Sequence, residues 1–154
     1  MSEGNRPEAP MRDFSRSLPM ALLKAREAVM DRFRPSLREF GITEQQWRVL
    51  RALYGRGEVE TGALAGLCCL LTPSLSRILK HLEATGLVSR RPAPSDQRRT
   101  LVTISTAGRA LLERRAPLSE AQYRAIEEAF GKERIDALYS TLGDLVEALE
   151  KTNS

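Results

Sequence analysis

The chain has 154 residues, of which 42% are hydrophobic and 29% are charged, and its formal net charge at pH 7 is +4. This length and composition predict one ordinary globular unit and exclude a largely disordered chain. No apolar run approaches the roughly 20 residues of a membrane span, so no membrane partner is expected. The small positive charge favours a polyanionic partner without identifying one.

The first predicted elements are a tail and a long helix. Residues 1–12 lack the apolar core of a signal peptide, so we expect a flexible tail, followed by a single unit over 13–154. Apolar residues then recur at every third or fourth position up to Phe40, which predicts a helix over about 14–40. Pro35 lacks a backbone donor and is expected to kink that helix.

Two shorter helices are predicted next. Thr43 and Gln46 form a capping-box pattern, which indicates a helix over about 44–54. The glycines of "GRGE" end this helix, and Thr61 begins the following one, "GALAGLCC". This pair leads into the segment whose helix boundaries are the most clearly marked in the sequence.

The segment "TPSLSRILKHLEATG" carries signals for both ends of a helix. Thr72 can cap the N-terminus, Pro73 fits the first helical position, and Gly86 can adopt the left-handed conformation that ends a helix. Its leucines and isoleucine fall on one face, which must lie against a core. The opposite face is small, polar and basic and presents Ser74, Ser76, Arg77, Lys80 and His81.

A β-hairpin is predicted after this helix. The β-prone runs "LVSRR" and "TLVTIS" flank "PAPSDQRR", whose Pro, Ser and Asp favour a turn. Arg98 and Arg99 are therefore expected at the hairpin tip, where an exposed pair of arginines adds almost nothing to stability. Two short helices followed by a hairpin predict a winged helix-turn-helix lobe over about 43–104.

The remaining segment, about 106–151, is predicted to be helical and to begin at Ser105 or Thr106. Near its end, apolar residues recur at spacings of three and four, which form the seam of two heptads and indicate a partner helix. The seam consists of Ile135, Leu138, Leu142, Leu145 and Leu149. The predicted fold is mainly α, an α+β winged helix-turn-helix with long N-terminal and C-terminal dimerisation helices.

Positive charge is concentrated in the middle of the chain. Residues 72–115 contain nine Lys or Arg against three Asp or Glu, whereas residues 116–154 contain four against eight. This distribution is typical of a nucleic-acid-binding face. A helix fits the major groove of DNA, and arginines of an adjacent hairpin can enter the minor groove. The predicted DNA-binding residues are Thr72, Ser74, Ser76, Arg77, Lys80, His81, Asp96, Arg98 and Arg99.

Asp96 is an acidic residue within this basic hairpin. A carboxylate is an unusual choice opposite phosphates, so two interpretations stay open. Either Asp96 pairs with Arg98 or Arg99 and fixes the direction of that side chain, or it is a solvated residue that favours the turn.

The block "GLVSRRPAPSDQRRTLVTISTAGRALL" resembles the wing of MarR-family transcriptional regulators, with the D-x-R element of that family at Asp96 and Arg98. "STAG" resembles the helix start that follows the wing, although Ser105 stands where a leucine is usual. The segments "ALLKAREAVMDRFRP" and "ITEQQWRVLRAL" resemble the branch that represses operons for homoprotocatechuate (4-hydroxyphenylacetate) degradation. The resemblance extends over nearly the whole chain.

The resemblance implies a homodimer, held by its first and last helices, that represses transcription by binding a pseudo-palindromic DNA operator. It also implies a small aromatic acid as inducer, bound between the dimerisation helices and the DNA-binding lobe. Such a ligand needs a cation for its carboxylate and an apolar slot for its ring. The candidates are Arg26, Trp47 and Arg48; alternatively, Arg26 is an interhelical ion-pair partner, Trp47 a core residue and Arg48 a solvated charge.

Cys68 and Cys69 are adjacent in the sequence. Side chains of consecutive helical residues point about 100° apart, so no disulfide between them is expected, and reduced thiols suit a cytoplasmic protein. They leave open an alternative function, a thiol-based redox sensor of the same family. Against it, the apolar "LCCLL" offers no base that would activate a thiol.

Other classes of function fit the sequence less well. Enzymatic activity is not expected, because the single histidine, His81, lies on an outward helix face without catalytic neighbours. One histidine and two adjacent cysteines cannot supply the three or four ligands of a zinc site, and no cofactor motif is present. A non-specific DNA-coating protein would need only charge, whereas serines at the start of the basic helix favour recognition of bases.

Overall fold

The computed structural model describes residues 9–153. Residues 1–8, most of the predicted tail, lie outside the described residues. A short 3-10 helix (Phe14–Arg16) precedes the long helix α1 (Leu18–Glu39). α1 continues through Pro35 to its end four residues later, so the proline does not divide the predicted helix.

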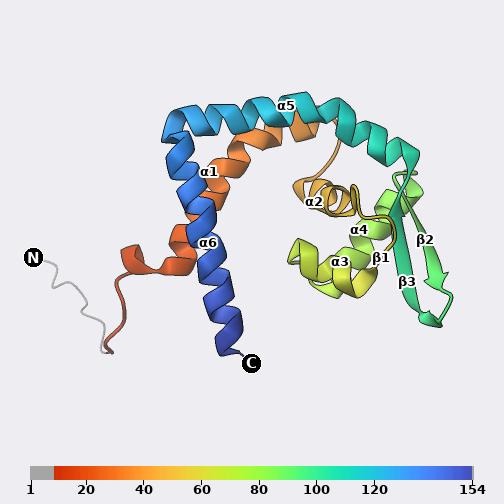
Figure 1. Ribbon diagram of the computed structural model, residues 1–154, viewed down its shortest axis with the longest axis horizontal. Helices are drawn as coiled ribbons and strands as arrows, with labels where there is room; N and C mark the ends of the chain where they lie inside the picture. Colours follow the sequence, from red (N-terminus) through yellow and green to blue (C-terminus); the bar gives the residue numbers. More distant parts are fainter. Residues whose placement is uncertain (1–8, 154) are drawn as a thin grey trace, which may run out of the picture.

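Three helices and three strands follow and form the predicted lobe (Figure 1). The strands make an antiparallel sheet in the order β1-β3-β2. β1 is only two residues long and therefore shows no alternating pattern, which is why the sequence does not predict it. The elements are α2 (Glu44–Leu53), β1 (Val59–Glu60), α3 (Thr61–Cys68), α4 (Thr72–Ala84), β2 (Val88–Ala93) and β3 (Asp96–Ile104).

The capping box predicted for α2 is complete. The backbone N–H of Gln46 donates to Thr43 Oγ1, and the backbone N–H of Thr43 donates to Gln46 Oε1, each over 3.1 Å. Two of the backbone donors that a helix start leaves unpaired are thereby satisfied. This cap fixes where α2 begins, directly after the end of α1.

The end of α4 agrees with the prediction and its start differs by one residue. Gly86 has a φ of +76°, and the backbone N–H of Leu87 donates to the Leu82 carbonyl over 2.9 Å, which is the expected left-handed helix end. The predicted cap at Thr72 is wrong, because the N-cap is Leu71 and its side chain makes no capping bond. Leu71 already has an extended backbone, so the chain turns into the helix one residue earlier than predicted.

The hairpin turn is shorter than the sequence indicates. Only residues 94–95 separate β2 from β3, because strand pairing extends to Ala93 opposite Asp96. Arg98 and Arg99 therefore lie in the first residues of β3, next to the turn, and not in the turn itself. Their position at the far end of the wing is nevertheless as predicted.

The two C-terminal helices are α5 (Thr106–Phe130) and α6 (Lys132–Thr152). Gly131 separates them with a φ of +106°, a conformation that favours glycine. In Figure 1, α5 extends from the wing across the top of the molecule, and α6 then runs down beside α1. Residues of α1, α5 and α6 line a common apolar groove, which confirms that these three helices lie together.

The start of α5 packs closely against the end of α4. The hydroxyl of Ser105 caps α5 by accepting from the backbone N–H of Gly108, and it donates to the Gly86 carbonyl over 2.6 Å. A Cβ atom at Gly108 would lie 2.3 Å from the Leu87 carbonyl oxygen, so only glycine fits there. These contacts fix the direction in which α5 leaves the lobe.

The hydrophobic core lies in the lobe. The four residues predicted on the inner face of α4 are all buried, and the inner residues of α2, α3, β2 and β3 join them. The outer helices are α1, α5 and α6. Of these, only the end of α1 and the start of α5 contribute buried residues, and α6 contributes none within its described length. The four buried residues of α4 are Leu75, Ile78, Leu79 and Leu82.

No single helix among the described residues is long and apolar enough to cross a membrane. α3 and α4 reach the required length and composition only as a pair, and that pair is bent by 105° at the intervening turn. The leucines that make the pair apolar, including Leu64, Leu75 and Leu79, are the buried residues of the lobe.

Candidate nucleic-acid interface and adjoining pocket

The outer face of α4 presents the predicted polar and basic side chains. Ser76, Arg77, Lys80 and His81 are exposed, and Ser74 is half-buried. Burial of the opposite, apolar face holds α4 in this orientation. Between α4 and the start of α2 lies a hollow of about 440 Å³, lined by Thr43, Gln45, Gln46, Ser74, Arg77, Ile78 and His81.

Two arginines of β2 hold the wing against the rest of the lobe. Arg90 donates from Nε and Nη2 to the Glu83 carboxylate of α4, over 3.2 and 3.0 Å. Arg91 makes a similar two-point contact with Glu58, just before β1. Hydrogen bonds from these arginines lower the pKa of Glu83 and of Glu58 below the usual value of 4.5. Both arginines of β2 are thus occupied within the chain.

The arginines of β3 are placed differently. The side chain of Arg98 is 93% exposed, and Asp96 Oδ1 accepts from its backbone N–H over 3.0 Å and from its Nε over 3.3 Å. Arg99 Nη1 lies 3.5 Å from Glu60, and its Nε lies 3.9 Å from the other Asp96 oxygen. Asp96 thus contacts both arginines, as its first interpretation predicts, and its bond to the Arg98 backbone N–H also fits the second, a residue that favours the turn.

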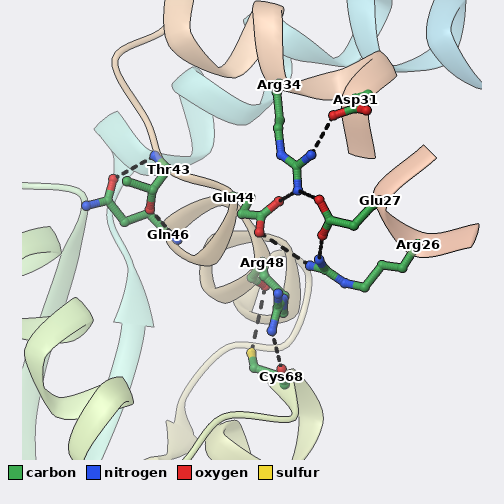
Figure 2. A network of polar contacts seen from close by, with 9 residues as sticks. All are labelled: Arg26, Glu27, Asp31, Arg34, Thr43, Glu44, Gln46, Arg48 and Cys68. Atoms are coloured by element: carbon green, nitrogen blue, oxygen red, sulfur yellow. Dashed lines mark hydrogen bonds and ion pairs between the residues drawn. The ribbon is translucent and has the colours of Figure 1, made fainter. Parts of the chain in front are cut away.

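Arg26, a predicted ligand residue, takes part in a network that joins α1 to α2 (Figure 2). It lies 3.4 Å from Glu27 and 3.6 Å from Glu44. Arg34 is the centre of the network and contacts Glu27 at 2.7 Å, Asp31 at 2.6 Å and Glu44 at 3.4 Å. Hydrogen bonds to Glu27 and then Asp31 raise the pKa of Arg34. The network holds the start of α2 against the middle of α1.

Arg48, another predicted ligand residue, links α2 to α3. Its Nη1 donates to the Cys68 carbonyl over 3.0 Å, and Cys68 Sγ lies 3.8 Å from the Arg48 carbonyl, as Figure 2 shows. Neither Arg48 nor Arg26 lines the pocket that contains Trp47. The structure thus does not bring the three predicted ligand residues together, and their part in ligand binding stays a prediction.

Trp47 lines a pocket of about 220 Å³ between α2 and the middle of α5. Arg51 follows it by four residues on α2, and Tyr54, the residue directly after α2, follows it by seven. This spacing places them on the side of Trp47, a signal that was available in the sequence. Tyr54 donates from its hydroxyl to Glu113 over 3.1 Å, and partial burial raises the pKa of Tyr123. The remaining lining residues are Leu112, Glu113, Ala116, Ser119, Glu120 and Tyr123.

Arg115 is one of the nine basic residues counted over residues 72–115, but it does not lie on the exposed basic face. Its side chain is 0% exposed, which makes it the largest fully buried side chain among the described residues. The helical spacing contained a signal for this position, because Arg115 follows Gly108, Leu111 and Leu112 on the buried stripe of α5. An arginine where an apolar residue is expected was the indication that the sequence analysis missed.

The cysteines do not favour the redox alternative. Both are free, Cys68 buried and Cys69 exposed. Burial raises the pKa of the Cys68 thiol, which lowers the fraction of reactive thiolate. Among residues 9–153, no group of three His, Cys, Asp or Glu side chains could hold a metal ion.

The fold, with an exposed basic helix beside a hairpin wing, defines a winged-helix DNA-binding protein. The model of the MarR family matches residues 42–100 of the chain. The homoprotocatechuate degradative operon repressor of Escherichia coli is 39% identical over 130 residues, which cover 84% of this chain and 88% of that protein. The chain belongs to the MarR family, and its resemblance to the homoprotocatechuate branch is confirmed.

Solved structures agree with this assignment. The crystal structure of NadR in complex with 4-hydroxyphenylacetate superposes with a TM-score of 0.76 at 39% identity and covers 89% of this chain and 97% of NadR. The repressor CouR bound to a 23-mer DNA duplex has a TM-score of 0.78 at 28% identity and covers 90% of this chain and 99% of CouR. The predicted fold class, a winged helix-turn-helix with long outer helices, is confirmed.

Proposed function

We propose that the protein is a homodimeric repressor that binds a pseudo-palindromic DNA operator and releases it when a small aromatic carboxylate is bound. The observation that carries the proposal is the pairing of an exposed, basic face of α4 with the 93% exposed Arg98 on the adjacent wing. Both can approach one duplex, α4 through the major groove and Arg98 through the minor groove. CouR, which has the same fold, is bound to a 23-mer DNA duplex in its solved structure, which supports duplex DNA as the partner.

Dimerisation is supported by the apolar residues that one chain leaves uncovered. Leu138 and Leu149 of the α6 seam are 43% and 57% exposed, and Leu18 and Leu22 of α1 are exposed as well. Such a stripe is costly in water and stable when a second copy covers it. A twofold dimer would place two α4 helices on half-sites about one helical turn, roughly 34 Å, apart.

The pocket at Trp47 is the proposed inducer site. It lies between α2 of the lobe and α5 of the outer helices, so a ligand there contacts both parts. Trp47 and Tyr123 offer apolar ring surfaces, and Arg51 offers a cation for a carboxylate. NadR, 39% identical to this chain, was crystallised with 4-hydroxyphenylacetate, which supports a hydroxyphenylacetate as the ligand.

The experiment begins with selection of preferred duplexes from a random pool and continues with anisotropy titrations of the selected duplex in excess random DNA. We expect a pseudo-palindromic sequence, bound by two chains, and release when 4-hydroxyphenylacetate is added. Affinity controlled by salt alone, with no preferred sequence, would overturn the proposed repressor. Tight specific binding that 4-hydroxyphenylacetate does not alter would overturn the proposed inducer.

A further inference from the structure

The guanidinium of Arg115 is enclosed where three helices meet. From α5, its Nη2 donates to the hydroxyl of Ser36 on α1 over 2.9 Å. Its Cζ lies 4.0 Å from the ring centroid of Trp47 on α2. The Ser36 hydroxyl in turn donates to the Phe33 carbonyl, so it accepts from Arg115 without losing its own partner. Arg115 therefore joins the outer helices α1 and α5 to α2 of the lobe.

Within residues 9–153, the charge of Arg115 has no acidic partner. No Asp or Glu among the described residues forms an ion pair with it, and its Nε and Nη1 are buried without a hydrogen-bond partner. The face of the Trp47 ring offsets part of this cost through a cation–π contact. A buried charge left without a counter-ion still carries a large desolvation cost, which an anion brought close to it would reduce.

The inducer pocket and the enclosed Arg115 guanidinium share the same tryptophan. Trp47 lines the pocket and also covers the Arg115 guanidinium. Leu112 and Ala116, which flank Arg115 on α5, line the pocket as well. The charged groups that face the pocket are the cation of Arg51 and the carboxylates of Glu113 and Glu120. Without Arg115, these lining charges sum to a net negative pocket that would disfavour a carboxylate.

We propose that Arg115 is a specificity-determining residue that makes the Trp47 pocket select anionic over neutral aromatic ligands. Arg115 does not line the pocket itself. It holds the Trp47 ring in position, and its positive charge offsets the negative charge of Glu113 and Glu120. Although Arg115 does not line the pocket, its charge still acts on a ligand there, because little water screens a charge in a low-dielectric interior. The inference rests on the proposed function, since it concerns the ligand of the same pocket.

The test compares a carboxylate with its neutral isostere in the full-length protein. Kd values for 4-hydroxyphenylacetate and 4-hydroxyphenylacetamide are measured by calorimetry for the wild type and for Arg115→Met. We expect the wild type to prefer the acid and Arg115→Met to bind the acid about tenfold more weakly, with unchanged affinity for the amide. Methionine fills similar volume, and apolar replacement of buried charges is usually tolerated.

Two further variants make the result decisive. Arg114→Met removes the same charge from the neighbouring, exposed position on α5 and should keep the wild-type preference for the acid. Arg115→Gln keeps a donor for Ser36 without a charge and takes the place of Arg115→Met if that variant does not fold. An unchanged acid-to-amide ratio in the Arg115 variants overturns the inference and leaves the proposed inducer site intact. A wild type that binds neither compound overturns the proposed inducer site, and the inference with it.

Discussion

The lobe and the outer helices differ in how far their regularly spaced apolar residues are buried. In the lobe, the inner leucines Leu50, Leu53, Leu64 and Leu82 are fully buried within one chain. In the outer helices, residues with equally regular spacing, such as Leu138 and Leu149, remain 43% and 57% exposed. The same periodicity therefore accompanies a completed core in the lobe and an uncovered apolar surface in α1, α5 and α6, which we propose a second copy covers.

Two arginines, Arg98 of the lobe and Arg115 of the outer helices, show the opposite pattern of burial. In the lobe, Arg98 is held by Asp96 and is 93% exposed. In the outer helices, Arg115 is fully enclosed against Ser36 and Trp47. These two arginines thus show the reverse of the pattern in the leucines named above, because Arg98 of the lobe is exposed and Arg115 of the outer helices is buried. We propose that contact with DNA and contact with a second chain account for these two exposed surfaces.

The largest effect is expected from charges placed on the α6 seam. Leu138→Asp combined with Leu149→Asp should convert the proposed dimer to monomers, because each substitution places a carboxylate in the apolar contact that we propose between copies. Loss of the second recognition helix should weaken operator binding by at least about a hundredfold. Sedimentation velocity and anisotropy measure the two effects. Ser140→Asp, on the outer face of α6, should leave both unchanged, and a dimeric double variant would contradict the assignment of the seam.

A core substitution in the lobe should act on stability and leave assembly intact. Leu79→Ala removes a side chain that is 1% exposed and should lower the free energy of unfolding by about 2–5 kcal/mol, measured by urea denaturation. The variant should remain dimeric at low temperature. The matched control is Leu71→Ala, because Leu71 is 77% exposed and should cost little stability. Equal losses at the two positions would show that the lobe core is misassigned.

Removal of the wing arginine should act on DNA alone. Arg98→Ala should weaken operator binding by about 1–3 kcal/mol, since it removes a contact with the duplex, and should leave the melting temperature unchanged. Anisotropy and thermal denaturation measure the two quantities. Arg124→Ala, which removes the same charge from α5, is the control for net charge. A drop in melting temperature with Arg98→Ala would make the residue structural.

The smallest effect is expected from the ion pairs that hold the wing. The pKa values of Glu58 and Glu83 are lowered in the folded state, so these pairs add stability above the usual value of 4.5. That contribution is lost as the pH falls through the lowered pKa values. Glu58→Gln with Glu83→Gln should therefore unfold with a shallower pH dependence between about pH 5 and about pH 3. Identical pH dependence of the melting temperature in wild type and variant would argue against this contribution.

Local sequence signals predicted the elements of the lobe well. The capping box at Thr43 and Gln46, the left-handed Gly86 and the apolar stripe of α4 are each set by neighbours within a few residues, so the sequence contains them in full. β1 depends on pairing with a strand about 40 residues later in the chain, and no local pattern marks it. The length of the hairpin turn was likewise set by strand pairing.

The pocket was less accessible to prediction, because it joins two distant helices. Trp47 was identified as a ring-bearing residue, but its neighbours Glu120 and Tyr123 come from α5, more than 70 residues away in the sequence. Arg26 and Arg48 have the charge that the proposed ligand needs, yet their ion-pair and carbonyl contacts lie elsewhere. Charge type can be recognised in a sequence, whereas the partner that uses the charge depends on the tertiary fold.

The central claim is that two copies place α4 and the wing on one duplex. Hydroxyl-radical footprinting of the selected duplex, with wild type and Arg98→Ala side by side, tests it most directly. We expect two protected segments centred about one helical turn apart, with protection at the outer minor-groove positions lost in Arg98→Ala. A single protected segment, or a wild-type pattern that Arg98→Ala leaves unchanged, would contradict the claim.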